Sequence, residues 1–340
     1  MNLQALHRRI EQLADSTVLV VGDVILDEYL IGRAARLSRE APIPVLEFME
    51  RRLIPGGAAN PAANIAALGS RAIQIGIVGA DTSADEIRRA LETRGIDATG
   101  LVTDSARPTI VKTRILAHQG LSFPQQVARL DRIERTPING GVEEAVLARI
   151  ASQPAVDAIL VSDYLSGLLT HSIVAHLRDF GEQRGVLLTA DAQGQLDKYR
   201  SFDVVKCNRR EASHVTGKTL RTDADIAAAG RQLVERLALK RAMLITRGAD
   251  GITTIEADGR VAHLRQFAGA QAEVFDTVGA GDTVIAVLTL ALIAGAPVTE
   301  AAILANVAAG LVVRRISNYT PSPEELHRAL ETWAENAEQQ

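Results

Sequence analysis

Short runs rich in β-branched residues alternate along this chain with longer stretches whose apolar residues recur at helical spacing. Buried parallel strands read as continuous apolar runs, and a crossover helix joins each strand to the next. The sequence therefore predicts an α/β fold with a doubly wound, mainly parallel sheet and helices on both faces. The expected strands are residues 18–21, 73–78, 158–161, 186–189, 204–206 and 243–246. The expected helices are residues 61–68, 84–94, 143–152, 172–183, 223–237, 284–294, 298–315 and 324–336.

Two stretches, residues 28–53 and 108–134, break this alternation. Both are rich in strand-like alternation of apolar and polar residues, and no helical pattern intervenes. We expect them to pair into a small antiparallel β-sheet that projects from the body as a lid. No Gly/Ser-rich linker, repeat or low-complexity tract divides the chain, so residues 1–340 are predicted to form one domain.

Composition excludes several classes of protein. The net charge of -4 gives no strong field for nucleic acid or membranes, and aromatic residues make up only 3% of the chain. No apolar run approaches the roughly 18 residues that a membrane span needs. Cys207 is the sole cysteine, so the sequence predicts no intrachain disulfide and no cysteine metal cluster. The N-terminus reads as an amphipathic helix rather than a signal peptide, and we expect a cytoplasmic protein.

The segment from Asp276 to Thr283 carries the strongest chemical signal. The small-residue turn Gly279-Ala280-Gly281 delivers Asp282 to the start of an apolar helix. Glycines let backbone N–H groups close on an anion, and a helix start adds its positive end. A carboxylate beside such a site can take a proton from a hydroxyl while the N–H groups stabilise a transferring phosphoryl group. The alternative is an ordinary helix start with aspartate as a cap.

Two further clusters could hold a polyhydroxylated ligand. Gly56 and Gly57 let a ligand approach the backbone, and Asn60 offers both a donor and an acceptor in the first turn of a small-residue helix. Asp23 and Asp27 follow the first strand, at the end where open α/β sheets bind ligands. The alternatives are a tight loop before a packed helix and turn-forming aspartates.

Residues at two other strand ends could bind a nucleotide. Asn208 and Glu211 follow the strand at 204–206 and could order a hydrated Mg²⁺ near phosphates, although a capping box has the same spacing. Thr246, Gly248 and Gly251 follow the strand at 243–246 and could hold phosphates or ribose, although a plain hairpin turn explains them equally well.

Three apparent motifs are rejected. Gly217-Lys218-Thr219 resembles the end of a phosphate loop, but the required first glycine is Ala212 and no strand immediately precedes the segment. The Gly-x-Gly at 279–281 lacks the third glycine of a dinucleotide fingerprint. The seven histidines show no paired spacing for zinc.

Taken in order, these segments resemble the ribokinase-like (PfkB) carbohydrate kinases over residues 18–326. Residues 276–283 are similar to that family's C-terminal signature, and Gly56-Gly57-x-x-Asn60 is similar to its N-terminal signature. Within the family, residues 22–27, 36–45, 161–164 and 275–276 look most like the D-glycero-β-D-manno-heptose-7-phosphate kinases, the kinase domain of ADP-heptose synthesis. Those enzymes phosphorylate the anomeric hydroxyl of their sugar.

The resemblance implies a fold, a reaction and a set of roles: a ribokinase-like kinase that uses Mg²⁺ and ATP, with Asp282 as general base. The implied catalytic residues are Asp282, Gly279, Ala280 and Gly281. The implied nucleotide-binding residues are Asn208, Glu211, Thr246, Gly248, Gly251 and Asn306, with Glu211 supporting Mg²⁺ through water. The implied substrate-binding residues are Asp23, Asp27, Gly56, Gly57, Asn60, Lys112 and Arg114. Asp276 would stiffen the anion hole beside a monovalent cation such as K⁺.

The chain departs from this pattern in four places, and the departures leave the sugar open. Asp191-Ala192-Gln193 stands where Asp-Pro-Lys is usual, and Ser38-Arg39-Glu40 stands where Ser-Pro-Glu is usual. Residues 120–124 look like an insertion in the lid, and Ser317-Asn318 replaces a Gly-Thr. A kinase for another sugar or sugar phosphate is therefore the first alternative, and a non-catalytic sugar- or nucleotide-binding regulator is the second.

The lid carries two further predictions. Arg33, Arg36, Lys112, Arg114 and Arg129 fall in or beside it, which favours an acceptor with a phosphate remote from the reacting hydroxyl; the alternative is a solvated basic surface. Its strand edges and apolar positions predict a homodimer formed through the lid. The expected partners are thus ATP, a sugar phosphate and a second copy of the chain.

Overall fold

The computed structural model describes residues 2–118, 124–153, 155–266, 276–315 and 318–338. Its body is built around a nine-stranded sheet with the order β13-β12-β11-β10-β9-β8-β1-β4-β5. Neighbouring strands from β11 to β5 run parallel, and β12 and β13 add an antiparallel edge. The strands are β1 (Thr17–Gly22), β4 (Arg71–Val78), β5 (Asp97–Thr103), β8 (Ala158–Asp163), β9 (Leu187–Ala192), β10 (Val204–Asn208), β11 (Ala242–Thr246), β12 (Ile252–Glu256) and β13 (Val261–Leu264).

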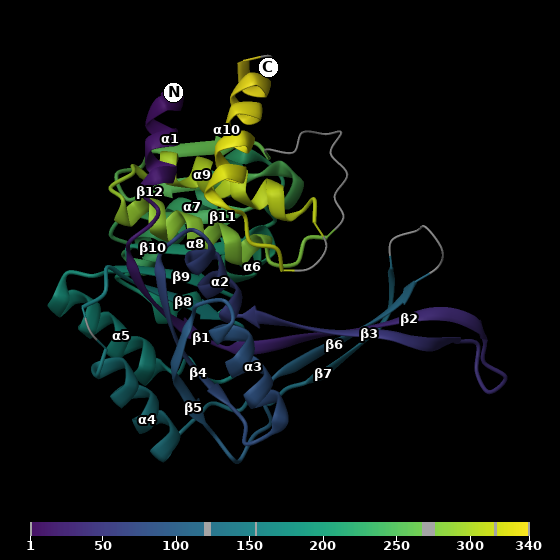
Figure 1. The fold of residues 1–340 in the computed structure, drawn as a ribbon. Helices are drawn as coiled ribbons and strands as arrows, with labels where there is room; N and C mark the ends of the chain where they lie inside the picture. Colours follow the sequence, from purple (N-terminus) through teal and green to yellow (C-terminus); the bar gives the residue numbers. More distant parts are fainter. Residues whose placement is uncertain (1, 119–123, 154, 267–275, 316–317, 339–340) are drawn as a thin grey trace.

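Helices cover both faces of this sheet (Figure 1). The alternation along β1 explains the two layers, because Val18 and Val20 enter one apolar cluster while Leu19 and Val21 enter the other. The first layer holds α1 (Leu3–Glu11), α2 (Ala59–Ala67), α3 (Thr82–Glu92), α8 (Ala280–Ile293), α9 (Val298–Val312) and α10 (Pro323–Glu338). The second layer holds α4 (Gly140–Ala151), α5 (His171–Arg184), α6 (Arg209–Thr216) and α7 (Asp223–Leu237).

The doubly wound, mainly parallel fold predicted from the alternation is confirmed. The prediction missed β5 and β13, and it began α8 four residues late, at 284 instead of Ala280. Helix α8 is apolar on every side because it lies between the sheet and α9, with its residues from Asp282 to Leu292 buried. Within the described ranges, no helix combines the length and the apolarity that crossing a bilayer requires.

The lid is a separate four-stranded sheet with the order β3-β2-β6-β7, and it projects from the body (Figure 1). Its strands are β2 (Val24–Leu37), β3 (Pro44–Gly57), β6 (Val111–His118) and β7 (Gln125–Arg132). Both hairpins are antiparallel, but the central pair β2 and β6 is parallel. The expectation of an antiparallel lid is therefore wrong at its centre. Strands β2 and β6 each follow the carboxyl end of a parallel body strand, β1 and β5 respectively. They run outward from the same edge of the body sheet, so they must point in the same direction. Residues 120–123 of the predicted insertion lie outside the described residues.

Candidate active site

The site is built at the carboxyl end of the sheet, where α8 begins. Gly279 precedes the helix with a φ of 81°, a left-handed conformation that favours glycine. A Cβ on Gly279 would lie 2.7 Å from Asn60 Nδ2 and 2.9 Å from Asn318 Oδ1, so glycine also allows these two amides to approach. The predicted small-residue turn thus brings the first turn of α8 against α2 and the C-terminal segment.

Asp282 lies in that first turn and is almost fully buried. Asn60 Nδ2 donates to Asp282 Oδ2 across 2.9 Å, and the Tyr164 hydroxyl donates to Asp282 Oδ1 across 2.8 Å. Burial, followed by the charge of Asp191, raises the pKa of Asp282 to about 6, while the two hydrogen bonds and Lys206 oppose the shift. The carboxylate is therefore held in place and can accept a proton near neutral pH.

Asp23 lies at the base of the same region, but its carboxylate faces the backbone. Its oxygens accept hydrogen bonds from the backbone N–H groups of Tyr164, Ser166 and Leu168, at 2.9, 3.0 and 3.4 Å. Burial and Asp163 raise the pKa of Asp23 to about 6 against these bonds. Asp23 thereby fixes the loop after β8 that carries Tyr164. The structure does not bring it to the surface of the site as a free sugar acceptor.

Asp27 lies where the lid joins the body. It accepts from Arg114 Nη1 at 2.5 Å and from Asn318 Nδ2 at 2.9 Å. A Cβ on Gly56 would come within 2.1 Å of Asp27 Oδ2, so the glycine is required for this close approach. Asn318 Oδ1 is buried and has no hydrogen-bond partner among the described residues. This junction therefore holds an acceptor oxygen next to the turn that precedes α8.

Gly57 and Lys112 complete the near end of the lid. Gly57 has a φ of 56°, and a Cβ there would meet the Asp23 carbonyl oxygen at 2.3 Å. Lys112 Nζ lies 5.0 Å from the centre of the Tyr164 ring, and burial lowers the pKa of this lysine. This near end of the lid, which contains Asp27, Gly56, Gly57, Lys112 and Arg114, is called the lid base below. It places an ammonium close to the tyrosine that contacts Asp282.

The five basic residues of the lid are not gathered in one place. Lys112, Arg114 and Arg129 lie at the near end, where Arg114 and Arg129 are cross-strand partners and Arg129 pairs with Asp131 at 2.7 Å. Arg33 pairs with Glu47 on the outer part of the lid, and Arg36 lies beyond it. Arg33 is six residues along β2 from Asp27, a rise of about 20 Å. The outer two arginines therefore do not join the near cluster within one chain.

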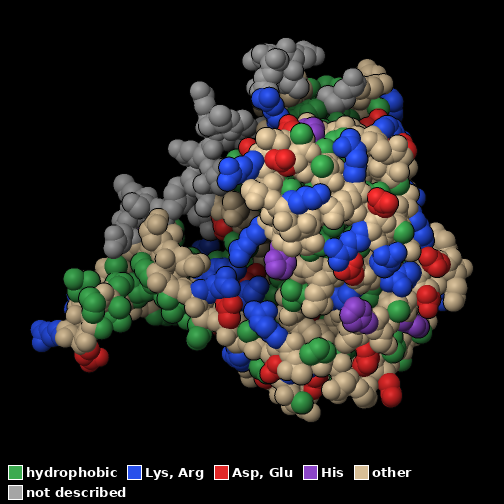
Figure 2. Space-filling view, turned by 180° about the vertical axis from the view of Figure 1, so that it is seen from behind, with side chains coloured by type: hydrophobic (Ala, Val, Ile, Leu, Met, Phe, Trp, Pro, Cys, Tyr) green, Lys and Arg blue, Asp and Glu red, His purple; other side chains and the backbone are tan. Residues whose placement is uncertain are grey.

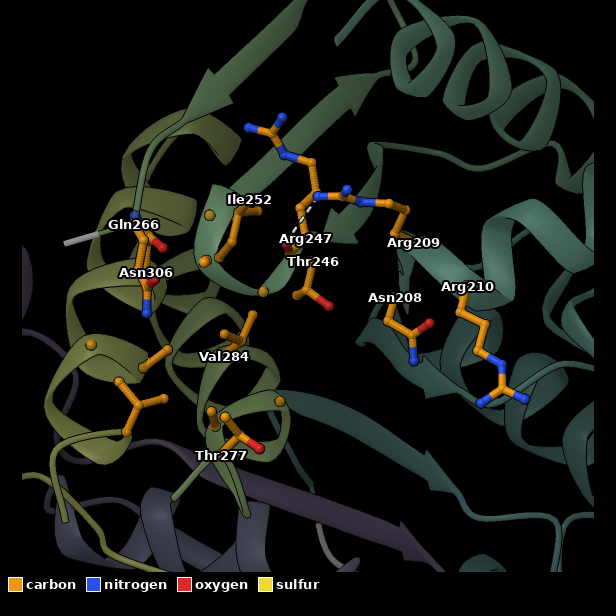
Figure 3. A pocket seen from close by; sticks show the side chains of 18 residues that line it. Asn208, Arg209, Arg210, Thr246, Arg247, Ile252, Gln266, Thr277, Val284 and Asn306 are labelled. Atoms are coloured by element: carbon orange, nitrogen blue, oxygen red, sulfur yellow. Dashed lines mark hydrogen bonds between the residues drawn. The ribbon is translucent and has the colours of Figure 1, made fainter. Parts of the chain in front are cut away.

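A cavity of about 580 Å³ lies on the other side of the α8 turn (Figure 3). Its size is that of a small-molecule site. The lining comes from β10, α6, β11, β12, α8 and α9, with Gln266 after β13 and Thr277 before α8. Asn306 and Gln266 lie across the cavity from Asn208 and Arg209. The predicted residues that line it are Asn208, Thr246, Gly248, Gly251, Ala280, Gly281 and Asn306.

Asn208 and Glu211 form the capping box that was the alternative interpretation. Asn208 N–H donates to Glu211 Oε2 at 2.6 Å, and Glu211 N–H donates to Asn208 Oδ1 at 2.9 Å. Burial raises the pKa of Glu211, which is not itself among the residues that line the cavity. The described residues contain no group of three or more His, Cys, Asp or Glu side chains that could hold a metal alone. A magnesium ion carried by nucleotide phosphates fits this sparse donor set, because Mg²⁺ keeps several waters.

Three other predictions are settled or left open by the geometry. Thr246 and Gly251 flank an antiparallel β11–β12 hairpin, so the hairpin interpretation holds while both residues also line the cavity. Gly217 ends α6 with a φ of 68°, so Lys218 follows a helix instead of opening one, as the rejection of a phosphate loop requires. Asp276 Oδ1 accepts from Val278 N–H at 2.9 Å; residue 275, beside it, lies outside the described residues.

The sequence interpretation assigned no role to four residues that the structure brings to the site: Tyr164, Asn318, Asp191 and Lys206. Lys206 Nζ donates to Asp191 Oδ2 at 2.6 Å, and these residues are opposite each other on β10 and β9. The available signal was a charged residue at the end of the predicted strand 204–206 and another two residues after the predicted strand 186–189. Tyr164 and Asn318 offered no such signal, because their partners are more than 100 residues away.

Comparison with known proteins gives one family and several relatives. The profile of the pfkB family carbohydrate kinases matches residues 15–325. The bifunctional protein HldE of Geobacter metallireducens is 40% identical over 314 residues, which are 92% of this chain and 62% of that protein. HldE of Geobacter sulfurreducens is 39% identical over the same shares. The chain thus spans less than two thirds of the length of these relatives.

Solved structures give the same fold at low identity. Ribokinase of Arabidopsis thaliana, complexed with ribose and ATP, has a TM-score of 0.69 at 21% identity and covers 94% of this chain and 99% of its own. Phosphofructokinase-2 of Escherichia coli, in complex with substrates and products, has a TM-score of 0.76 at 17% identity and covers 94% and 100%. At these identities the likeness extends to the fold alone.

Proposed function

Because this chain belongs to the pfkB family of carbohydrate kinases, we propose that it transfers the γ-phosphoryl group of ATP to the anomeric hydroxyl of a heptose 7-phosphate. The observation that carries the proposal is the place of Asp282, a buried carboxylate between the cavity and the lid base. The heptose assignment rests on residues 22–27 and 36–45 and on the similarity to HldE.

In the proposed reaction, Asp282 takes the proton of the acceptor hydroxyl. The hydroxyl oxygen then forms a bond to the γ-phosphorus while the bond from that phosphorus to the β,γ-bridging oxygen breaks, and ADP leaves. The backbone N–H groups of Gly279, Ala280 and Gly281 stabilise the charge on the transferring group. A pKa of about 6 suits Asp282 to this task, since the group is ionised at neutral pH and still accepts a proton.

The cavity is proposed to hold ATP. Asn306 donates a hydrogen bond from Nδ2 to the Arg265 carbonyl oxygen at 2.6 Å and would lie near the adenine. Thr246, Gly248 and Gly251 would line the nucleotide, and the phosphates would extend toward the start of α8. Bound Mg²⁺ would neutralise charge on the β- and γ-phosphates. Asn208 and Glu211 would hold it through water.

The acceptor sugar is proposed to bind at the lid base. Asp27, Gly56, Gly57 and Asn60 would contact it, and Asn318 Oδ1 offers a further acceptor for a hydroxyl. Lys112 and Arg114, assisted by Arg129, would hold the remote phosphate, because a cation cluster favours a phosphate ester over a neutral sugar. Asp23 acts in this proposal by positioning the loop of Tyr164.

A substrate screen tests the function directly. Purified protein with Mg·ATP would be given heptose 7-phosphate, hexose phosphates and the matching neutral sugars, with ADP release followed by a coupled assay. We expect the highest kcat/KM for heptose 7-phosphate, with a new anomeric phosphate by phosphorus NMR. A higher kcat/KM for another sugar would move the protein elsewhere in the family. ATP binding without turnover of any sugar would favour the regulator.

We also propose that the chain forms a homodimer through the lid. Figure 2 shows hydrophobic side chains gathered on this projection. Among the residues that the structure describes, the exposed large hydrophobic side chains all come from the lid and are Leu37, Ile43, Phe48, Met49, Val127 and Leu130. An exposed apolar sheet is covered in most stable proteins, and a second copy offers a matching face. A dependence on K⁺ through Asp276 stays a prediction, and so does the cytoplasmic location.

A further inference from the structure

Lys198 and Asp163 form a buried ion pair to which the proposed reaction gives no role. Lys198 Nζ lies 2.7 Å from Asp163 Oδ2, and the two side chains are only 5% and 2% exposed. Asp163 ends β8, and Lys198 lies in a short 3₁₀ helix, Leu196–Tyr199, between β9 and β10. The Tyr199 hydroxyl donates to the same carboxylate oxygen across 2.6 Å. Apolar residues of similar size often stabilise a fold as well as a buried ion pair does, so fold stability alone is a weak reason for this one.

The loop between Asp163 and Leu169 has a strained backbone. Leu165 has a φ of 55°, in the left-handed region that residues other than glycine seldom adopt. Gly167 has a φ of 94°, and a Cβ there would lie 2.3 Å from the Thr136 carbonyl oxygen. Strained backbone persists only where the surrounding groups hold it, and it is most frequent at functional sites.

The ion pair holds both ends of this loop. Asp163 Oδ1 accepts from the Leu165 N–H at 2.9 Å, which fixes the left-handed residue directly. Lys198 Nζ, beside the same carboxylate, donates to the Leu169 carbonyl oxygen at 2.9 Å. The first and the last residue of the loop are therefore joined through one ammonium group.

Tyr164 is the residue that this loop presents to the proposed base. Its hydroxyl donates to Asp282 Oδ1 at 2.8 Å, and this bond lowers the pKa of Asp282. The other groups that act on Asp282 come from separate elements and are Asn60 of α2, Asp191 of β9 and Lys206 of β10. A shift of the loop would therefore remove one hydrogen bond from the base and leave these three groups in place.

We propose that Lys198 and Asp163 are positioning residues, whose ion pair holds the strained loop in the conformation that places the Tyr164 hydroxyl on Asp282. This proposal rests on the role of Asp282 in the phosphoryl transfer proposed above. Lys198 keeps its proton and acts only through the loop. Loss of its charge leaves Asp163 as a buried, unpaired carboxylate and frees the Leu169 carbonyl, so the loop relaxes and the base loses its bond to the tyrosine.

The test follows the ionisation of Asp282 directly and needs no turnover. Carboxyl carbon NMR of aspartate-labelled protein would give the pKa of Asp282, with Asp282→Asn to assign its signal. In wild type this signal should titrate at about pH 6. In Lys198→Met the pKa should rise by about one unit, because a hydrogen bond to the charged carboxylate is lost. The acidic limb of kcat/KM should move to higher pH by the same amount. An Asp282 pKa within about 0.3 units of wild type would overturn the proposal.

A second variant guards against a failure of Lys198→Met to fold. Asp163→Asn keeps the shape of the side chain and removes its charge from Lys198, so it should raise the pKa of Asp282 in the same direction. An unchanged pKa in that variant would equally count against the ion pair.

Leu233→Ala is the control for loss of stability, because Leu233 is a fully buried residue of α7. It should lower the melting temperature without moving the Asp282 titration. An equal shift of the pKa in this control would assign the effect to general loosening of the fold and overturn the proposal. The titration needs neither ATP nor sugar, so absence of turnover would refute the proposed function without deciding the role of the ion pair.

Discussion

The hydroxyl of Tyr164 donates to Asp282 Oδ1 across 2.8 Å, so the loop after β8 contacts one oxygen of the proposed base while Asn60 contacts the other. The two donors fix both carboxylate oxygens and lower a pKa that burial raises. The loop that carries Tyr164 is in turn held by Asp23. Position and acidity of the base therefore depend on residues from three separate segments.

Asp282→Asn should lower kcat by roughly 10²–10⁴, the usual contribution of a general base. The amide can still occupy the site and contact Tyr164, so the fold and the dissociation constant for ADP should change little. Steady-state kinetics and calorimetry measure the two effects. A variant that keeps more than about a third of wild-type kcat would remove Asp282 from this role.

The pH dependence should report the raised pKa of Asp282. The base acts only when ionised, so kcat/KM should rise with pH through about 6 and level off above it. Tyr164→Phe removes a hydrogen bond that lowers this pKa, so the acidic limb should move to higher pH. Tyr319→Phe is the control: it loses a hydroxyl that donates a hydrogen bond to Glu325, and it should leave the acidic limb in place. An unchanged limb in Tyr164→Phe would contradict the assignment.

Arg114→Met and Lys112→Met should raise the KM for a sugar phosphate by about tenfold or more and alter the KM for ATP far less, since each removes a charged contact to the ester. Discrimination against the neutral sugar should fall in parallel. Arg71→Met removes an arginine paired with Asp97 on the body and serves as the control. Comparable kcat/KM values for the neutral sugar and its phosphate ester in wild type would count against a phosphate site.

Light scattering should give wild-type protein twice the 36.4 kDa mass of the chain. Phe48→Glu places a charge on an exposed apolar position of the edge strand β3, so the variant should shift toward the monomer. Thr332→Glu, on the exposed face of α10, is the matched control for the added charge. A wild-type protein that is monomeric at micromolar concentration would refute the dimer.

The sequence determined those features that depend on local pattern. Continuous apolar runs and helical periodicity specify which segments are buried strands and which are helices. The alternation of the two, with a crossover helix after each strand, specifies a parallel sheet, so the doubly wound body followed from sequence alone. The turn before Asp282 was also readable, because glycine tolerates the left-handed conformation found at Gly279 and marks a close approach to the backbone.

Only the tertiary structure decided which side chains meet. Asp23 looked like a sugar ligand, yet its oxygens bind the backbone of a loop some 140 residues away. The lid arginines read as one cluster, but the extended rise of β2 separates Arg33 from the lid base. Such contacts join residues far apart in the chain, and local periodicity carries no information on which strand ends will face each other. The pairing of Lys206 with Asp191 beside Gly281 arises in this way, from the order of strands in the sheet.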